Sequence, residues 1–319
     1  MMNRLYVTEP DAINVQLVRK MLSDDWEVVK GDPSFSGKDI EDCSALLIRS
    51  ATTVTAAVKE VFPNLRHIVR VGVGVDNIDV DFCDQEGIAV YNAPGANADA
   101  VSDYVVGMMF HALRKLHLLT QQDVISWNRF KFTGRSMAGR TIGIIGFGNI
   151  GKQIFSKLPG FNCKAFLVYD PFVKKEDMPE GTTYAASVEE VLRSSDIVTL
   201  HVPLIPSTKY LINKENLALL PEKSILINAS RGGIVNETEI TEYMQEHDLI
   251  YIADTVEGEP EVSEMLLNAK NVVVTPHIAS LTKEADDNMV IVALENFLSH
   301  KAMNRPAAVL ASAIRCCQF

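Results

Sequence analysis

The sequence predicts an α/β protein built from two doubly wound parallel-sheet domains with a cleft between them. Short apolar runs alternate with helix-like stretches along almost the whole chain, which is typical of parallel strands joined by crossover helices. A glycine-rich stretch at residues 146–151 directly follows one of these runs. The chain has 319 residues, which is enough to bury two separate cores.

Four apolar runs in the first hundred residues have the length and composition of buried strands. They are RLYVTE at 4–9, ALLIRS at 45–50, HIVRVGV at 67–73 and IAVYNA at 88–93. We interpret this part of the chain as the smaller of the two α/β domains.

Residues 98–119, ADAVSDYVVGMMFHALRKLHLL, are predicted to form one long helix that leaves the first domain and packs on the second. Asn97 or Asp99 could cap its start. Apolar residues recur at helical spacing, which indicates a core face or a dimer interface. These residues are Val101, Val105, Met108, Ala112, Leu116 and Leu119.

Six further apolar runs predict the sheet of the second domain. They are TIGIIG at 141–146, AFLVYD at 165–170, DIVTLHV at 196–202, SILINA at 224–229, IYIADT at 250–255 and NVVVTP at 271–276. A helical stretch at 282–300 then carries the chain back toward the first domain. The predicted domains are therefore 1–98 with 286–319, and 99–285.

The run TIGIIG is followed by Gly146-x-Gly148-x-x-Gly151 and then a helix. This order predicts a Rossmann dinucleotide site, because the glycines allow a tight turn and the free N–H groups of the helix start attract a pyrophosphate. The next strand ends in Asp170, 24 positions after Gly146. A carboxylate there accepts hydrogen bonds from ribose hydroxyls and repels a 2′-phosphate, which favours NAD over NADP.

Polar side chains follow three other strands of this predicted sheet. Arg231 follows SILINA, Asp254, Glu257 and Glu259 lie at the end of IYIADT, and His277 follows NVVVTP. Because ligands bind at the carboxyl ends of parallel strands, we expect these groups to meet at one edge. An arginine that grips a carboxylate and a histidine supported by a carboxylate suit hydride transfer at a 2-hydroxy acid. Either Glu257 or Glu259 could be the partner of the histidine.

The composition excludes several other classes of protein. A formal net charge of -11 argues against nucleic acid as a partner, because phosphate binding needs a basic surface. The start of the chain has no apolar signal core and no run is long enough to span a bilayer, so we expect neither export nor a membrane. The cysteines show no zinc-ligand spacing, so we expect no metal and a reducing cytoplasm. They are Cys43, Cys83, Cys163, Cys316 and Cys317.

The chain resembles the D-isomer-specific 2-hydroxyacid dehydrogenases, and within that family the D-3-phosphoglycerate dehydrogenases without their C-terminal regulatory domain. The resemblance covers almost the whole chain and depends on motifs that occur in the order of the family. They are RVGVGVDNID, NAPGANADAVSD, GIIGFGNIG, YDP, HVPLIPST, LINASRGGIV, EPE and TPHIAS. It implies a flavodoxin-like substrate domain beside the Rossmann NAD domain.

The resemblance also implies roles for individual residues. The catalytic residues would be Arg231, Glu259 and His277, with Glu259 preferred to Glu257 because it precedes Pro260. The NAD site would include Gly146, Gly148, Asn149, Ile150, Gly151, Asp170, Val202, Pro203, Thr208, Ala229, Ser230, Arg231, Asp254 and His277. The substrate would meet Arg49, Ser50, Arg70, Val73, Gly74, Asn97 and Arg231, with its carboxylate on the backbone N–H groups of the loop 71–74.

These residues predict an NAD-dependent oxidoreductase that acts on a D-2-hydroxy acid or 2-keto acid resembling 3-phosphoglycerate. Arg49 and Arg70 are the candidates for a second anionic group, and a salt bridge within the protein is the alternative for each. A general reductase of small keto acids such as glyoxylate, hydroxypyruvate or lactate-type acids is a second possibility. A non-catalytic NAD(H)-sensing interaction protein on the same fold is a third. The family analogy and the apolar helix predict a homodimer.

Overall fold

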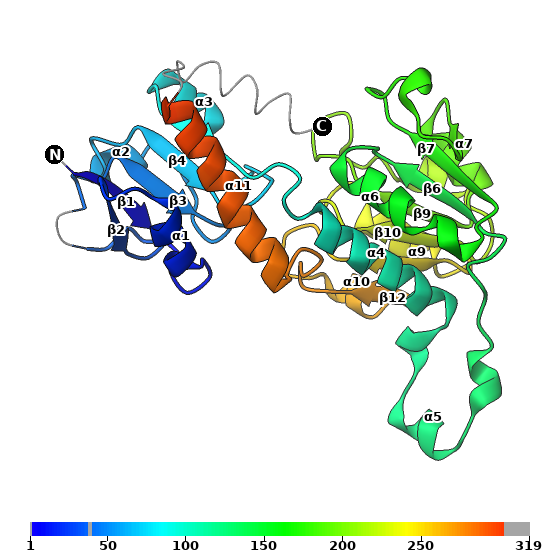
Figure 1. Cartoon of the computed structure of the whole chain (residues 1–319). Coiled ribbons are helices and arrows are strands. Elements are labelled where there is room, and N and C mark those ends of the chain that lie inside the picture. The colour runs from blue at the N-terminus through cyan, green and yellow to red at the C-terminus, as the bar shows by residue number, and fades with distance from the viewer. Residues whose placement is uncertain (1, 38–39, 303–319) are drawn as a thin grey trace. The chain divides into compact units, whose positions relative to one another are not determined.

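The computed structural model describes residues 2–37 and 40–302, and the chain divides into two compact units (Figure 1). Among the described residues, the first unit contains the chain up to Asn97 together with residues 281–302, and the second is Ala98–Ser280. The boundaries expected from the sequence were 98/99 and 285/286. Cys316, Cys317 and the tail 303–319 of the expected substrate domain lie outside the described residues.

The first unit contains a five-stranded parallel sheet in the order β2-β1-β3-β4-β5. This is the flavodoxin-like order that the family resemblance implied. The strands are β1 (Asn3–Val7), β2 (Trp26–Lys30), β3 (Ala45–Ile48), β4 (His67–Arg70) and β5 (Ala89–Tyr91). The helices are α1 (Val15–Met21), α2 (Val58–Val61), α3 (Val80–Gln85) and α11 (Lys283–Ala302).

Helix α11 completes the core of the first unit although it comes from the far end of the described chain. Phe297 is fully buried and its ring packs against Trp26, with ring centroids 5.2 Å apart. The side-chain amides of Asn288 and Asn296 donate to backbone carbonyl oxygens of the segment that follows β5. The helix therefore fixes both the sheet and the loop that leads to Asn97.

The second unit contains a seven-stranded parallel sheet in the order β12-β11-β10-β9-β6-β7-β8. Six of these strands reproduce the Rossmann order, and β12 extends the sheet at one edge, so the predicted fold class is confirmed. The strands are β6 (Thr141–Ile145), β7 (Ala165–Tyr169), β8 (Thr182–Tyr184), β9 (Ile197–Leu200), β10 (Ile225–Asn228), β11 (Ile250–Ala253) and β12 (Val272–Val274).

The helices of the second unit cover both faces of this sheet (Figure 1). The α-helices are α4 (Ala98–Leu113), α5 (Gln121–Ile125), α6 (Asn149–Lys157), α7 (Val188–Ser194), α8 (Lys214–Leu217), α9 (Glu237–Tyr243) and α10 (Glu264–Leu267). The 3-10 helices are η1 (Leu116–Leu118), η2 (Arg129–Phe132), η3 (Pro159–Phe161) and η4 (Lys175–Asp177). Among the described residues, no helix combines the length and the apolar character that crossing a membrane requires.

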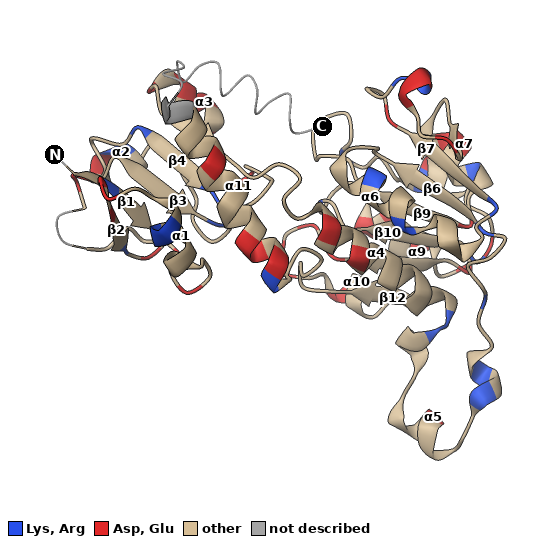
Figure 2. Cartoon of the chain, viewed as in Figure 1, with Lys and Arg blue, Asp and Glu red and all other residues tan. Residues whose placement is uncertain are grey.

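Helix α4 is shorter than the sequence predicted. It ends at Leu113, and Lys115 adopts a left-handed backbone conformation with φ of 56°, which stops the helix. Val101, Val105 and Ala112 are buried as expected, whereas Leu116 and Leu119 are each 50% exposed. Figure 2 shows acidic residues of α4 near basic residues of α6. Lys157 of α6 forms ion pairs with Asp99 and Asp103 at 2.7 and 2.6 Å.

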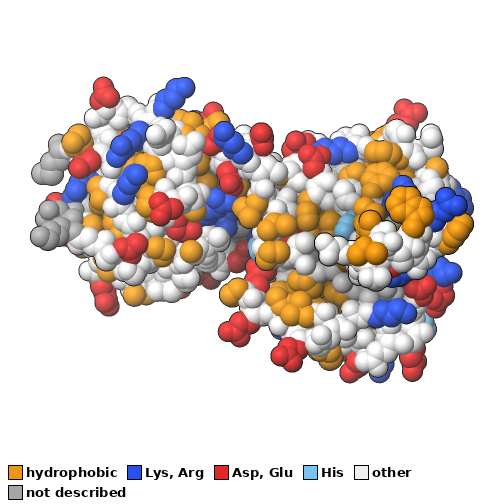
Figure 3. Space-filling model, turned by 90° about the horizontal axis from the view of Figure 1, so that it is seen from below, with side chains coloured by type: hydrophobic (Ala, Val, Ile, Leu, Met, Phe, Trp, Pro, Cys, Tyr) orange, Lys and Arg blue, Asp and Glu red, His pale blue; other side chains and the backbone are white. Residues whose placement is uncertain are grey.

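An arm follows α4 and extends away from the compact part of the second unit (Figure 1). We define it as residues 116–136, which include α5 and η2. Its large apolar side chains face solvent, and they contribute to the hydrophobic surface seen from below in Figure 3. They include Leu116, Leu118, Leu119, Val124, Ile125, Trp127 and Phe130.

Candidate active site

The topology of the second unit brings the predicted site residues to one edge of its sheet. Strands β12, β11, β10, β9 and β6 are consecutive neighbours and all are parallel. Their carboxyl ends therefore lie side by side, which is where α/β sheets bind ligands. The glycine turn follows β6, Arg231 follows β10, Glu259 follows β11 and His277 follows β12.

The turn after β6 has the tight geometry that the glycine pattern predicts. Gly146 has φ of +93°, and a Cβ atom there would lie 2.3 Å from the His201 carbonyl oxygen, so only glycine fits. Helix α6 begins at Asn149 without a side-chain cap on its first N–H groups. An open helix start behind a close backbone turn fits the pyrophosphate of a dinucleotide.

Asp170 lies at the end of β7 and is bonded to this turn. One carboxylate oxygen accepts a hydrogen bond from the Phe147 N–H at 2.7 Å, and the other accepts from the Phe172 N–H at 2.9 Å. The side chain is buried, so its orientation is fixed before any ligand binds. These bonds leave each oxygen a further lone pair for a ribose hydroxyl.

Three other predicted cofactor residues lie in the loop that follows β9. Val202 packs against the position where a Cβ of Gly146 would lie. The Thr208 hydroxyl contacts the Pro203 carbonyl oxygen at 2.5 Å and accepts from the Ile205 N–H at 2.9 Å. In the described residues, Thr208 thus closes its own loop, and its predicted contact with NAD stays a prediction.

Arg231 begins a turn that packs closely against the loop after β11. The Asn228 side-chain amide donates to the Arg231 carbonyl oxygen at 2.8 Å, while its amide oxygen accepts from the Ser230 hydroxyl. A Cβ atom on Gly232 would lie 2.2 Å from the Val256 carbonyl oxygen, so glycine is required where the two loops meet. The sequence prediction missed Asn228, although an amide at the end of an otherwise apolar strand was the available signal.

The histidine and one of the two candidate glutamates form a direct pair. His277 Nδ1 lies 2.8 Å from Glu259 Oε1, whereas Glu257 accepts a hydrogen bond from the Tyr210 hydroxyl at 2.7 Å. The bond to His277 lowers the pKa of Glu259, so this carboxyl group is ionised near neutral pH. An ionised Glu259 places the imidazole proton on Nδ1 and leaves Nε2 available.

Asp254 fixes the backbone that presents His277. Its carboxylate is 1% exposed and accepts hydrogen bonds from the Thr275 hydroxyl and the Ile278 and Ala279 N–H groups, at 2.6, 2.8 and 2.9 Å. His277 itself has φ of 53°, in the left-handed region that is uncommon for residues other than glycine. The predicted contact of Asp254 with nicotinamide would be additional to this structural role.

The predicted substrate residues of the first unit lie in and around the loop 71–74. The Asn92 side-chain amide donates to the Val73 carbonyl oxygen at 2.7 Å and so holds the loop. Neither the Val73 N–H nor the Gly74 N–H donates a hydrogen bond to another described residue. A Cβ atom on Gly72 would lie 1.3 Å from Arg70 Nη1, so the Arg70 guanidinium lies against this loop.

Arg49 has protein partners within the first unit. Its Nη2 lies 2.6 Å from the carboxylate of Asp286, and its Nη1 donates to the Ala12 carbonyl oxygen at 2.7 Å. Ser50 and Asn97, the other two substrate residues expected here, have no hydrogen bond recorded from their side chains among the described residues. Asn77, which the sequence prediction missed, anchors the adjoining turn by donating to the Arg49 and Thr52 carbonyl oxygens.

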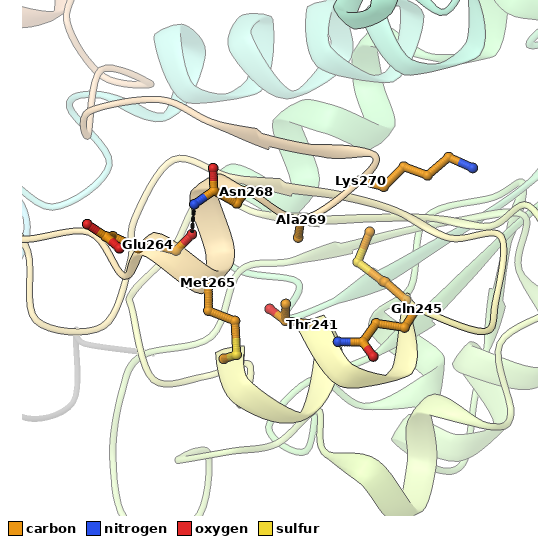
Figure 4. A pocket seen from close by; sticks show the side chains of 8 residues that line it. Thr241, Gln245, Glu264, Met265, Asn268, Ala269 and Lys270 are labelled. Atoms are coloured by element: carbon orange, nitrogen blue, oxygen red, sulfur yellow. Dashed lines mark hydrogen bonds between the residues drawn. The ribbon is translucent and has the colours of Figure 1, made fainter.

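A surface cavity of about 470 Å³ lies elsewhere on the second unit (Figure 4). It is formed by the carboxyl end of α9 and by α10, together with the residues that directly follow each helix, and it contains none of the predicted site residues. The lining residues are Thr241, Met244, Gln245, Glu264, Met265, Asn268, Ala269 and Lys270.

Residues 106–279 match the family model described as the NAD binding domain of D-isomer specific 2-hydroxyacid dehydrogenases. The chain is 37% identical to the D-3-phosphoglycerate dehydrogenase of Methanocaldococcus jannaschii over 77% of its own length and 47% of that protein. It is 36% identical to the hydroxypyruvate reductase of Thermotoga maritima over 81% of its own length and 85% of that protein. The chain thus spans about half the length of the phosphoglycerate dehydrogenase and most of the reductase.

Solved structures are similar over both units. The NAD+-bound 3-phosphoglycerate dehydrogenase of Entamoeba histolytica superposes with a TM-score of 0.79 and 28% identity, covering 96% of this chain and 97% of the other. The NADPH-dependent glyoxylate/hydroxypyruvate reductase of Sinorhizobium meliloti superposes with a TM-score of 0.81 and 25% identity, covering 95% and 96%. Relatives with this architecture therefore differ in both substrate and nicotinamide cofactor.

Proposed function

The chain belongs to the D-isomer specific 2-hydroxyacid dehydrogenase family, and we propose that it transfers a hydride between NAD and a D-2-hydroxy acid or its 2-keto acid. The observation that carries the proposal is the His277–Glu259 hydrogen bond of 2.8 Å at the carboxyl edge of the sheet, one strand away from Arg231. A histidine with a fixed tautomer after β12 and an arginine after β10, with Glu259 after the strand between them, are the groups that this reaction needs.

His277 would act as the acid or base for the oxygen of the substrate. In the direction of reduction, protonated His277 donates a proton to the C2 oxygen, and in oxidation the neutral imidazole removes it. Glu259 stabilises the protonated imidazole, because its carboxylate lies on the opposite ring nitrogen. Arg231 would orient the carboxylate and polarise the C2 oxygen through its guanidinium.

NAD would bind through the turn at Gly146 and the start of α6, with Asp170 directed to the adenosine ribose. The geometry of the turn supports this assignment, since the close approach of the His201 carbonyl oxygen leaves no room for a side chain at Gly146. When bound, the nicotinamide would accept or donate the hydride. The remaining cofactor positions of the sequence prediction are part of the same proposal.

The substrate would bind its carboxylate on the N–H groups of Val73 and Gly74. Two N–H groups that have no acceptor among the described residues are suited to an anion. Arg70, whose guanidinium lies against this loop, is the candidate for a second anionic group such as a phosphate. We therefore propose a substrate that resembles 3-phosphoglycerate.

A general reductase of small keto acids is the second candidate. Two observations favour it: Arg49 is already bonded to Asp286, and the hydroxypyruvate reductase of T. maritima matches over 85% of its length. An arginine that is bonded within the protein contributes little to the binding of a phosphate, so Arg49 gives weaker support to a phosphorylated substrate than the sequence alone suggests.

We also propose that the protein is a homodimer that associates through the arm 116–136. Trp127, Ile125 and Phe130 are each at least 76% exposed, and monomeric proteins rarely expose so many large apolar side chains together. Sedimentation should give a dimer for the wild-type protein and a monomer for Phe130→Asp. A wild-type protein that sediments as a monomer would overturn this assignment.

We further propose a reducing compartment, which is consistent with free thiols at Cys43, Cys83 and Cys163. Burial raises the pKa of Cys43 to about 11 and that of Cys83 to about 12, so neither thiol is ionised near neutral pH. They therefore behave as packed core residues.

The decisive experiment is NADH oxidation with a panel that contains phosphohydroxypyruvate, hydroxypyruvate, glyoxylate and pyruvate. A preference for phosphohydroxypyruvate is expected, and a preference for hydroxypyruvate or glyoxylate would support the second candidate instead. Tight NADH binding without turnover of any acid would overturn the enzymatic proposal and support an NAD(H)-sensing protein.

A further inference from the structure

A buried carboxyl group contacts the loop that carries Glu259. Glu237 is only 6% exposed, and its Oε1 accepts a hydrogen bond from the Glu257 backbone N–H at 2.8 Å. Glu257 is two residues before Glu259, whose carboxylate pairs with His277. Charged residues are rarely buried to this degree without a specific partner, and here the partner is the backbone of the catalytic loop.

The same segment also connects this loop to Arg231. Residues 232–237 lead from the arginine into α9, and Gly232 packs directly against the backbone of Val256 and Glu257. Two contacts thus join the two loops: the backbone packing at Gly232 and the hydrogen bond at Glu237. The backbone N of Glu257 takes part in both contacts, since it packs against Gly232 and donates to Glu237.

Capping of α9 does not account for Glu237. An acidic residue in the first turn of a helix is common, because it interacts favourably with the free N–H groups there. In α9, however, Asn236 provides the cap by accepting from the Glu239 N–H at 3.2 Å. Glu237 bonds a different loop and is buried, whereas an acid that serves only the helix dipole can remain in solvent.

The electrostatics of Glu237 agree with a role in hydrogen bonding rather than in charge pairing. The pKa of Glu237 is raised to about 7. Burial is the largest cause, the bond from the Glu257 N–H opposes it, and the nearby negative charges of Glu257 and Glu259 add to it. A carboxyl group retains an oxygen that can accept this bond whether or not it is ionised. The contact with the loop therefore persists across neutral pH.

We propose that Glu237 is a positioning residue, which holds the Glu257 N–H and thereby directs Glu259 onto His277. This inference rests on the proposed function, because it assigns Glu237 to the proton transfer of that reaction. Glu237 acts through Glu259 and has no contact with the reacting atoms in this role. A carboxylate that is misplaced by about 1 Å can reduce turnover by about 100-fold.

The test compares Glu237→Ala, which removes the acceptor, with Glu237→Gln, which keeps an amide oxygen as acceptor. Glu239→Gln is the matched control, since Glu239 lies in the same turn of α9 but accepts from the Lys214 N–H. We expect Glu237→Ala to lower kcat by about 10- to 100-fold and to change the solvent deuterium isotope effect on kcat. The KM for NADH should stay within about twofold, and Glu237→Gln should retain kcat within about threefold.

A second measurement does not depend on turnover. The proton on His277 Nδ1 should give a downfield ¹H NMR signal in the cofactor-free protein, assigned by its loss in His277→Gln. We expect this signal to remain in Glu237→Gln and Glu239→Gln, and to shift or broaden in Glu237→Ala. If no acid is turned over by the wild-type protein, the proposed function fails, and this signal still decides whether Glu237 positions the pair.

The proposal is overturned if Glu237→Ala keeps wild-type kcat and an unchanged NMR signal, or if Glu237→Gln is as impaired as Glu237→Ala. An equal loss in the control Glu239→Gln would overturn it as well. Should Glu237→Ala fail to fold, Glu237→Asp replaces it in both measurements. Its carboxyl group is one methylene shorter and cannot reach the Glu257 N–H without movement of the helix, so the same losses are expected.

Discussion

The carboxyl edge of the second unit's sheet and the loop 71–74 of the first unit differ in how far their polar groups are already bonded. At the sheet edge, Glu259 pairs with His277 and Asp254 accepts three hydrogen bonds. In the loop, the N–H groups of Val73 and Gly74 donate to no described residue. Under the proposed function, this difference would separate two tasks: the groups for chemistry are preorganised by the protein, while the N–H groups for recognition are left to bind a ligand.

The largest expected effect is on kcat, and it comes from His277 at the carboxyl edge of the second unit's sheet. His277→Ala should lower kcat by about 100- to 10,000-fold, which is the usual contribution of a positioned acid or base, and should leave NADH affinity nearly unchanged. Steady-state kinetics and NADH fluorescence titration measure the two quantities. Near-normal turnover in this variant would show that the preorganised pair is not the acid–base group.

The next effect tests the recognition loop. Arg70→Ala should raise KM for phosphohydroxypyruvate by about 10- to 150-fold, because a charge-assisted hydrogen bond contributes about 1.5–3 kcal/mol. The KM for hydroxypyruvate should hardly change. If both substrates are affected equally, Arg70 has no contact with a phosphate and the phosphorylated substrate should be dropped.

Arg49→Ala is the comparison variant for Arg70→Ala, because both arginines belong to the first unit. Arg49 is 14% exposed on its side chain and bonded to Asp286, so its loss should destabilise the first unit more than it weakens substrate binding. We expect a lower Tm and nearly equal changes in KM for the phosphorylated and unphosphorylated acids. A selective rise in KM for phosphohydroxypyruvate would instead assign the phosphate to Arg49.

A smaller effect is expected from Asp170, the proposed contact of the second unit with the ribose of NAD. Asp170→Ser should reduce the preference for NADH over NADPH by about tenfold, since one carboxylate–ribose interaction and its repulsion of a 2′-phosphate are lost. The ratio of kcat/KM for the two cofactors is the measurement. A wild-type protein that already prefers NADPH, as the S. meliloti relative does by its name, would contradict the assignment of Asp170.

The smallest effect is a pH dependence of stability at Glu237. Its pKa is raised in the folded protein to about 7, so the folded state binds the proton more tightly than the unfolded chain. Stability should therefore fall by about 1–3 kcal/mol as pH rises from about 4.5 to 7, and Glu237→Gln should lack this component. Thermal unfolding of both proteins between pH 5 and 8 tests the difference, and parallel Tm curves would contradict it. The titratable groups that face Glu237 are Glu257, Glu259, Tyr210 and Tyr251.

Most of the fold could be predicted from local sequence patterns, and the exceptions have a common cause. The edge strands β2 and β8 were missed, because residues such as Glu27 and Thr183 face solvent and break the apolar runs. The end of α4 was placed too late, since the apolar stripe continues to Leu119 while the backbone turns at Lys115. The spacing of apolar residues predicts which face of an element is buried, but it does not predict where the element ends or whether it lies at the edge of a sheet.

The candidate site was predictable where its chemistry depends on residue type and position along a strand. Arg231, Glu259 and His277 follow consecutive strands, so parallel topology alone brings them to one edge. Asn228 and Glu237 were not predicted, because their roles consist of hydrogen bonds to backbone groups that no sequence pattern marks.

The sequence by itself determined the order of most strands and helices, the glycine turn at Gly146 and the residue types available for catalysis, because each depends on neighbours along the chain. The residues alone left Glu257 and Glu259 open, the family resemblance favoured Glu259, and the tertiary structure shows that Glu259 contacts His277. Only the tertiary structure shows that Arg49 bonds Asp286, which lies 237 positions later. A hydrogen bond or ion pair needs two atoms within about 3 Å. Only the packing of distant segments sets such a distance, and local composition cannot.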